Sequence, residues 1–277
     1  MEKELNKEHF VQEILKSLNT NKDTISEQWQ NPKGTSTKHF FLDKLLPQEY
    51  VDKIYSSFPK NGDNFFDRES FREKKKTSAD LSKFDPILTD ITYALQDPRV
   101  VDLISNICNL RMIEPDPMLY GSGLSIMNLN DYLNPHIDNS HDGERKKYRR
   151  MNLLFYVSPN WKIENGGNFE LWNDDRSSPL TIVSEQNRLV VMETTRFSWH
   201  SVSKVRADRP RCCISNYYFS EESPHGTNYF HVTSFLGRPE EPFKKFLGVF
   251  DNLFRNIFSK SFKIGRGKHL MFKDKNK

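Results

Sequence analysis

The amino-acid sequence predicts an α+β protein with a mainly β core, an antiparallel barrel or jelly roll, and with helices before and after it. Three observations support this fold class. After Pro117, short apolar or alternating runs are separated by turn residues such as Gly166 and Gly167, which is typical of antiparallel strands. Before that point, apolar residues recur mostly with helical spacing. Helical spacing returns in residues 238–260.

Length and composition limit the organisation of the chain. A chain of 277 residues can bury one substantial core, so we expect a single domain over residues 1–277. Within it, residues 1–117 are a support of helices and loops, 118–222 the β core, and 223–277 an extension. The hydrophobic content of 36% and charged content of 28% exclude a disordered chain. The net charge of +4 is modest and aromatic residues do not interleave with the basic runs, so no nucleic-acid partner is expected.

The first 117 residues are expected to be mostly helical. Residues 5–30 have the pattern of one polar amphipathic helix, and residues 31–43 that of a turn followed by a short strand. A further helix is predicted over residues 45–58, with prolines near both ends. Residues 61–82 are polar and charged and predict a loop, whereas residues 86–110 return to helical periodicity.

The β core is predicted from six runs with the character of strands. In chain order they are GLSIMNL, MNLLFYVS, NFELWN, LTIVS, RLVVMET and RCCISNYYFS. Successive side chains of a strand point to opposite faces, so every second residue of a run shares a face.

The last predicted element is an amphipathic helix in residues 238–260. Its apolar stripe is formed by Phe243, Phe246, Leu247, Phe250, Leu253, Phe254, Ile257 and Phe258. Basic side chains border the stripe, which would also suit a helix lying on a membrane surface. We favour packing on the protein's own core or on a second copy of the chain, which would make a homodimer through this helix.

Cysteine usage and the amino terminus indicate the compartment. Cys108, Cys212 and Cys213 form no CxxC pair, so neither a disulfide framework nor a zinc ribbon is predicted. The charged amino terminus lacks the apolar stretch of a signal peptide, and no run is long enough for a membrane span. We therefore expect a cytoplasmic protein.

The stretch NPHIDNSH contains candidate metal ligands. His136 and Asp138 stand two residues apart, so both face the same side of a strand. A non-haem Fe(II) site of two histidines and one carboxylate then needs a second histidine. His200, after the run RLVVMET, is the favoured ligand, and His141 is the alternative because HxDxxH could be a compact set. Turn formers in residues 139–143 would carry His141 off the strand face, which favours His200.

The run RCCISNYYFS contains a candidate carboxylate anchor. Arg211 and Ser215 share one face of this predicted strand. A guanidinium group binds a carboxylate through two parallel hydrogen bonds, and a hydroxyl can donate to the same group. By the same alternation Asn152 and Tyr156 share a face and can add polar contacts to the acid. Arg150 has the parity of Asn152 and is the alternative to Arg211.

The order of the motifs HID, WKIENGGNFELW, WHSV and RCCISNYYF resembles that of the Fe(II)/2-oxoglutarate-dependent oxygenases, in their prolyl 4-hydroxylase-like branch. The resemblance covers about residues 118–222 and implies a double-stranded β-helix, a cupin-like jelly roll. Met127 stands where prolyl hydroxylases often have a tyrosine near the cosubstrate. Arg211 follows His200 by 11 residues, a longer spacing than is common. These departures leave peptidyl-proline open as the substrate without affecting the expected chemistry.

The resemblance also implies roles for the site residues. The two histidines and Asp138 would bind Fe(II), and Arg211 and Ser215, with Tyr156, would hold the distal carboxylate of 2-oxoglutarate. The expected enzyme is a dioxygenase that consumes O2, converts 2-oxoglutarate to succinate and CO2, and hydroxylates a substrate, with ascorbate as an optional reductant. The alternative is a non-catalytic cupin-like barrel that binds a metal or a sugar. Such a barrel has no need of a carboxylate clamp.

The substrate is the least defined part of this expectation. Substrate selection resides in loops, and the candidate walls are residues 67–78, 140–149 and 172–179. Two of them contain the basic runs REKKK and ERKKYRR, which would suit a phosphorylated sugar, a nucleotide or an acidic peptide. Solvated surface charge is the favoured interpretation of both runs. The substrate is therefore expected to be a small molecule, a sugar or a peptide.

Overall fold

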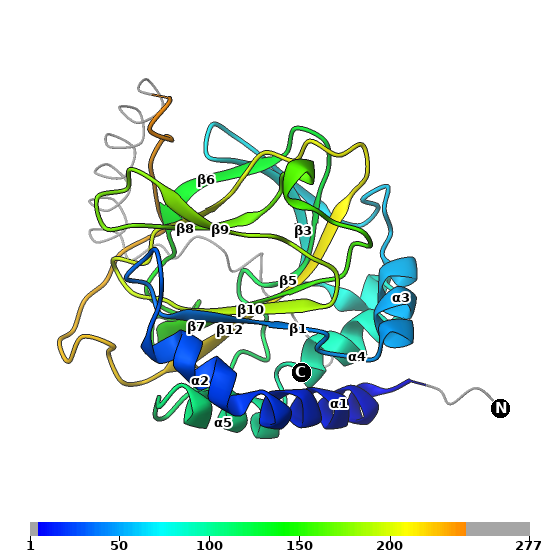
Figure 1. The fold of residues 1–277 in the computed structure, drawn as a ribbon, viewed down its shortest axis with the longest axis horizontal. Coiled ribbons are helices and arrows are strands. Elements are labelled where there is room, and N and C mark those ends of the chain that lie inside the picture. Colours follow the sequence, from blue (N-terminus) through cyan, green and yellow to red (C-terminus); the bar gives the residue numbers. More distant parts are fainter. Residues whose placement is uncertain (1–4, 242–277) are drawn as a thin grey trace.

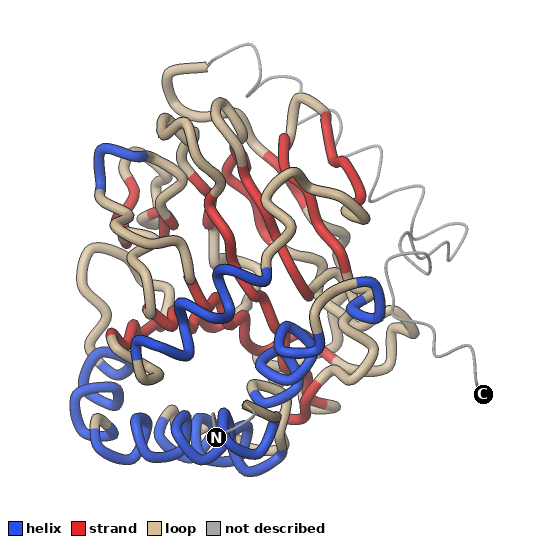
Figure 2. Tube along the Cα trace, turned by 90° about the vertical axis from the view of Figure 1, so that its right-hand side faces the viewer, coloured by secondary structure: helices blue, strands red, loops and turns tan. Residues whose placement is uncertain are grey.

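The computed structural model describes residues 5–241 as two facing layers of strands with helices packed beneath one layer (Figure 1). The helices are α1 (Lys7–Thr20), α2 (Lys22–Gln30), α3 (Gln48–Ser57), α4 (Pro86–Ala94) and α5 (Pro98–Ile107), with 3-10 turns at Leu81–Lys83 and Ile163–Asn165. They gather at one side of the molecule, which a view from the side shows clearly (Figure 2). The mainly β core and the helical amino-terminal support are both present as expected.

The described strands form one curled, antiparallel sheet. They are β1 (His39–Asp43), β2 (Phe66–Glu69), β3 (Glu73–Ser78), β4 (Glu114–Pro115), β5 (Gly123–Met127), β6 (Tyr132–Ile137), β7 (Tyr148–Tyr156), β8 (Phe169–Trp172), β9 (Pro179–Ile182), β10 (Arg188–Glu193), β11 (His200–Val202), β12 (Arg211–Ser220) and β13 (Ser234–Phe235). The order along the sheet is β1-β10-β7-β12-β5-β3-β6-β11-β8-β9, while β2, β4 and β13 pair at its margins. The non-sequential order means that strands far apart in the chain are neighbours in space.

Strand β7 shows how the sequence builds both sides of its layer. Leu153 and Phe155 belong to the main hydrophobic core, which includes Trp29 and the other buried residues of the helices. Leu154 and Tyr156 alternate with them and face the space between the layers, where a second cluster lies. Burial of one large apolar side chain such as Phe155 stabilises the folded state by about 1.5–3 kcal/mol, so packing against the helices stabilises this layer. The inner face is thereby free to hold polar groups.

Helices α4 and α5 begin at matching Asp-Pro pairs. The side chain of Asp85 accepts a hydrogen bond from the backbone of α4, and that of Asp97 accepts one from α5. Pro86 and Pro98 occupy the first turn, where a missing backbone N–H costs nothing. The two pairs explain why the segment 86–110 forms two short helices instead of one.

The structure corrects two further expectations for the amino-terminal region. Residues 5–30 form α1 and α2, because Asn21 leaves helical geometry between them. Residues 61–82 are not only loop, since they contain the hairpin of β2 and β3. The pattern hid this hairpin because its inward-facing residues are charged, so the apolar alternation of a half-buried strand is missing.

Two expectations concern membranes and the end of the chain. Among the helices of residues 5–241, none is long and apolar enough to cross a membrane. The amphipathic helix expected in residues 238–260, and with it the homodimer, falls almost entirely outside the described residues. The single-domain organisation over residues 1–277 stays a prediction.

Candidate metal centre

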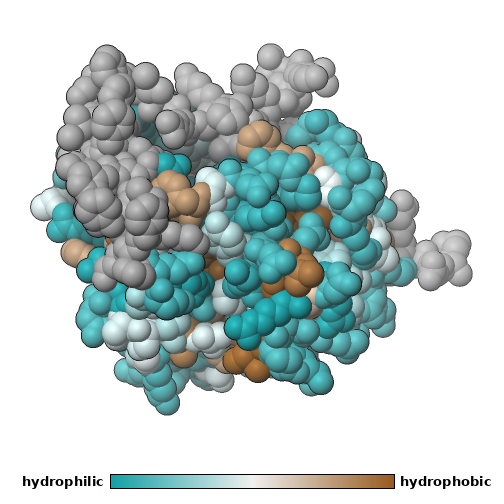
Figure 3. Space-filling view, turned by 90° about the horizontal axis from the view of Figure 1, so that it is seen from above, coloured by the Kyte–Doolittle hydropathy of each residue, from teal (hydrophilic) through white to brown (hydrophobic). Residues whose placement is uncertain are grey.

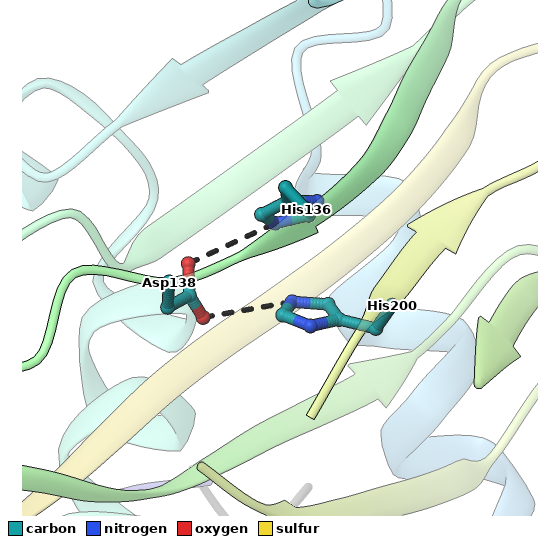
Figure 4. Close-up of side chains that lie close together, drawn as sticks. All are labelled: His136, Asp138 and His200. Atoms are coloured by element: carbon teal, nitrogen blue, oxygen red, sulfur yellow. Dashed lines mark ion pairs between the residues drawn. The ribbon is translucent and has the colours of Figure 1, made fainter. Parts of the chain in front are cut away.

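Three side chains of the inner face come together at one end of β6 and β11 (Figure 4). Nε2 of His136 lies 3.7 Å from Oδ1 of Asp138, and Nε2 of His200 lies 3.5 Å from Oδ2. One ligand atom from each residue lies within 4.8 Å of the others, and all three are largely buried. This set of two imidazoles and one carboxylate has the composition and spacing of a facial metal site.

The pairing of β6 with β11 explains how residues so far apart in sequence meet. His200 lies directly opposite His136, and their ring centroids are 4.1 Å apart. The register then shifts before Val202 reaches Leu133, which marks an extra residue on β6. Asp138 follows His136 by two residues and therefore projects to the same side.

Backbone carbonyl groups fix the orientation of both imidazole rings. Nδ1 of His136 lies 2.9 Å from the carbonyl oxygen of Asn134, and Nδ1 of His200 lies 3.0 Å from that of Ser198. A carbonyl oxygen only accepts, so Nδ1 carries the proton and Nε2 presents its lone pair to the centre. Burial and the neighbouring His200 lower the pKa of His136 to about 3, and burial also lowers the pKa of His200. Both rings are therefore neutral, as metal binding requires.

The carboxylate of Asp138 is held in the ionised form. Burial alone would raise its pKa, but the guanidinium of Arg149, together with the hydrogen bond from Asn152, outweighs burial and holds the pKa well below the usual range. Arg149 lies 3.3 Å from Oδ2, and the amide of Asn152 donates to the same oxygen at 2.6 Å. Since Oδ2 has these two partners, Oδ1 is the oxygen that is free to bind a metal.

Sequence alternation missed Arg149, because it placed Arg150 on the inner face. Phe219 lies opposite Arg149 although Tyr218 lies opposite Met151, so β7 contains one extra residue at this point. The β-bulge brings Arg149 inward. No feature of the run ERKKYRR indicates a bulge, and only the pairing with β12 reveals it.

Arg211 is the candidate anchor for a carboxylate. It is 3% exposed, its Nε donates to the hydroxyl of Ser184 at 3.1 Å, and its guanidinium lies 4.7 Å from the ring centroid of Tyr156. A further nitrogen lies 3.6 Å from the sulfur of Met127. Within residues 5–241 no carboxylate forms an ion pair with it. A buried guanidinium without a counter-ion is costly, so the site suits an acidic ligand.

Two glycines of the predicted hairpin make room for this arrangement. Gly167 has a φ of +62°, and a Cβ added there would lie 2.9 Å from Cδ of Arg211. Its carbonyl oxygen accepts a hydrogen bond from Ser184, the residue that Arg211 contacts. A Cβ on Gly166 would lie 2.0 Å from the backbone oxygen of Lys204. A side chain at either position would displace the wall beside Arg211.

The remaining candidates are distributed around this centre. The hydroxyl of Tyr156 is buried, with no partner at hydrogen-bond geometry in the described residues, so it is available to a ligand beside Arg211. Ser215 donates to the carbonyl oxygen of Gly123 and does not contact Arg211. Asn152, expected near the carboxylate anchor, contacts Asp138. The structure thus brings Tyr156 to Arg211 and moves Asn152 to the metal centre.

The two alternatives weighed from the sequence lie elsewhere. His141 is absent from the ligand group found in residues 5–241; its Nδ1 lies 2.8 Å from the hydroxyl of Ser140, and its ring packs on Tyr148. Arg150 lies 4.0 Å from Glu193. His141 therefore does not occupy the position of the third metal ligand, and Arg150 does not occupy the position of the carboxylate anchor.

Comparison with known proteins agrees with this geometry. Residues 122–219 match the family model of the 2OG-Fe(II) oxygenase superfamily, where 2OG is 2-oxoglutarate. Prolyl 3-hydroxylase OGFOD1 of Xenopus laevis is 31% identical over 103 residues, which are 34% of this chain and 20% of that protein. The same protein of Mus musculus is 30% identical over 96 residues, 32% of this chain and 17% of that protein. The chain therefore matches about a fifth of the length of these curated relatives.

Two solved structures show the fold. A prolyl-4-hydroxylase of Pseudomonas putida has a TM-score of 0.53 at 13% identity, covering 73% of this chain and 100% of that chain. Prolyl 4-hydroxylases from Phytophthora capsici give a TM-score of 0.53 at 14% identity, covering 94% of this chain and 79% of that chain. The predicted double-stranded β-helix is thereby confirmed. In the sequence of residues 122–219 and in fold, this chain is similar to the 2OG-Fe(II) oxygenases of the prolyl 4-hydroxylase-like branch.

Proposed function

We propose that this protein is an Fe(II)- and 2-oxoglutarate-dependent dioxygenase that hydroxylates a substrate while converting 2-oxoglutarate to succinate and CO2. The observation that supports it best is the combination of a neutral, oriented His-Asp-His set with a buried guanidinium that has no carboxylate partner in residues 5–241. A metal-binding barrel without an acidic cosubstrate would gain nothing from burying Arg211. Ascorbate as a reductant and a cytoplasmic location stay predictions.

The residues present fit both groups. His136, Asp138 and His200 would hold Fe(II) through Nε2, Oδ1 and Nε2. Arg211 would bind the distal carboxylate of 2-oxoglutarate, and the buried hydroxyl of Tyr156, whose ring lies against the same guanidinium, would donate to it. When bound, the iron and its cosubstrate supply the activation of O2 and the oxidation of a C–H bond.

Other residues of the chain would orient the metal ligands and shield them from water. Arg149 and Asn152 hold the second oxygen of Asp138, which fixes the direction of the first. Phe169 packs 5.8 Å from the ring of His200, and Phe235 stacks 5.0 Å from that of His136. These rings exclude water around the ligands and strengthen the electrostatic interactions at the centre.

Turnover in the absence of a substrate tests the proposal. Protein loaded with Fe(II) without O2 is given 2-oxoglutarate and then O2, and succinate is measured. Succinate formed by wild type and lost in His200→Ala and Arg211→Ala would support it. The matched controls are His141→Ala, which changes a histidine outside the ligand group, and Arg206→Ala, which changes an exposed arginine five residues before Arg211 in the chain. No succinate together with no binding of 2-oxoglutarate to the metal-loaded protein would favour the non-catalytic barrel.

A further inference from the structure

The chain returns to the metal centre after its last long strand, β12. Residues 231–238 run antiparallel beside residues 135–140, which include two of the three candidate metal ligands (Figure 1). The backbone N–H of Ser140 donates to a carbonyl oxygen of this segment at 3.0 Å, and the N–H of Leu236 donates to that of Pro135 at 2.8 Å. Between these two hydrogen bonds, β13 pairs with β6. We refer to residues 231–238 as the return segment.

The return segment occupies part of one edge of β6. Strand β3 pairs with Tyr132 and Leu133, whereas β13 pairs with His136 and Ile137. Both lie on the edge opposite β11, because Leu133 and His136 also pair with β11. Without the return segment, the half of β6 that holds a ligand would present unpaired backbone groups on this edge. The backbone of the ligand strand is therefore held from both sides.

Phe235 of the return segment packs on one of the ligands. It lies directly opposite His136 in the pairing of β13 with β6, so the two side chains share a face. The ring centroids are 5.0 Å apart, the ring planes are 17° from parallel, and Phe235 is 6% exposed. A buried ring in this position opposes rotation of the imidazole. Together with the contact between Nδ1 and the carbonyl oxygen of Asn134, it fixes the direction of Nε2.

Arg238 joins the end of the return segment to β8 and β11. Its guanidinium nitrogens lie 2.6 and 3.4 Å from the two carboxylate oxygens of Glu170 on β8, and one of them lies 3.3 Å from the carbonyl oxygen of Val202 on β11. The hydroxyl of Ser201 donates to the same carboxylate at 2.5 Å, and the indole N–H of Trp172 donates to that hydroxyl at 2.8 Å. These groups form one polar network across the two strands.

The polar network lies on the outer face of its layer. Ser201 follows His200 directly, so their side chains point to opposite faces of β11. Seen from above, this outer face is mainly hydrophilic in its visible, described part (Figure 3). Within residues 5–241, the main hydrophobic core beside the helices includes no residue of β6, β8 or β11. These strands therefore depend more on directed contacts, such as the fork of Arg238 on Glu170.

We propose that the return segment positions the ligands of the metal centre. Phe235 orients the ring of His136. Arg238 holds β11, and with it His200, from the outer face. This inference rests on the proposed function, because it concerns the residues that would hold the metal. One segment thus contacts the strands of both histidines and keeps the ligand atoms close together before a metal binds, which reduces the ordering that binding requires.

Binding of Co(II) to the full chain tests the inference without turnover. Co(II) is used because its visible absorption depends on the arrangement of ligands around the ion. We expect Phe235→Leu and Arg238→Met each to weaken Co(II) binding about tenfold and to change the absorption spectrum, because they release groups behind the metal ligands. Arg238→Lys keeps the charge without the planar fork and should fall between wild type and Arg238→Met. This milder variant decides the role of Arg238 if Arg238→Met does not fold.

The matched control is Arg188→Met. Arg188 makes a similar fork, with nitrogens 2.5 and 2.9 Å from the carboxylate oxygens of Asp43. This pair joins β10 to β1, which hold none of the three ligands. Arg188→Met should lower the thermal stability as Arg238→Met does, and it should leave the affinity for Co(II) and the spectrum as in wild type. The comparison separates a loss of stability from a loss of positioning.

Two results would overturn the inference. A Co(II) affinity within about twofold of wild type in Phe235→Leu or in Arg238→Met would remove the positioning role of that residue. An equal loss of affinity in Arg188→Met would show that any loss of stability weakens the site. Wild-type protein that binds no Co(II), or that binds it equally well after His200→Ala, contradicts the proposed metal centre instead, and the same titration reports it separately.

Discussion

Replacement of Arg211 by methionine should separate ligand binding from folding. The side chain is 3% exposed, and its hydrogen-bond partners within residues 5–241 are a serine hydroxyl and a methionine sulfur. If the guanidinium group of Arg211 makes two charge-assisted hydrogen bonds to a carboxylate, at about 1.5–3 kcal/mol each, their removal costs about 3–6 kcal/mol of binding free energy. That loss corresponds to a roughly 10²- to 10⁴-fold weaker binding of 2-oxoglutarate.

The same substitution should leave the protein as stable as before or more stable. Methionine fills a similar volume and removes a buried charge that has no counter-ion in the described residues, which is neutral or stabilising in comparable sites. Calorimetry with Mn(II)-loaded protein gives the affinity, and thermal unfolding without ligand gives the stability. Arg211→Lys, which keeps the charge without the planar fork, should fall between wild type and Arg211→Met. An affinity of Arg211→Met within about threefold of wild type would refute the assignment of Arg211 as the anchor.

Three further outcomes are expected. Arg149→Met should weaken metal binding about 10- to 100-fold, measured by competition with a chelating dye, because it releases one oxygen of the metal-binding carboxylate; unchanged affinity would show that Arg149 is only structural. Burial would raise the pKa of Glu73, but Lys75 and Arg68 lower it to about 2. The stabilisation by ionised Glu73 is therefore complete above pH 4.5 and is lost as the pH falls toward 2. In that pH window the free energy of unfolding should depend less on pH in Glu73→Gln than in wild type. Trp29→Ala should cost about 3–5 kcal/mol in urea unfolding, because this side chain is fully buried under the sheet, and a cost below 1 kcal/mol would contradict that packing.

The grouping of His136, Asp138 and His200 could be predicted from the sequence, because the alternation of side chains along a strand depends only on neighbouring residues. His136 and Asp138 share a strand face by simple alternation, and any antiparallel neighbour with a histidine at its end could complete the set. His200 fulfils this condition because it is the first residue of β11. Arg211 was placed on the inner face for the same reason, since its strand has regular alternation along the residues concerned, and its role as an anchor stays a prediction.

The sequence failed where the geometry depends on a partner strand. Arg149 faces inward only because β7 has a bulge against β12, and bulges leave no periodic signal. The hairpin of β2 and β3 was taken for a loop because its inner face is polar and charged, whereas strand prediction depends on apolar alternation. The contact of Asn152 with Asp138 was not predicted, since parity gives the face of a residue and not its neighbour across the barrel.

The measurement that tests the central claim most directly is the binding stoichiometry of the metal and the cosubstrate without O2. Equilibrium dialysis with Fe(II) and 2-oxoglutarate should give one of each per chain, with 2-oxoglutarate bound far more weakly when the metal is omitted. His200→Ala should lose both, and His141→Ala should keep both. Retention of Fe(II) and 2-oxoglutarate by His200→Ala, or equal binding of 2-oxoglutarate with and without metal, would contradict a site built from His136, Asp138, His200 and Arg211.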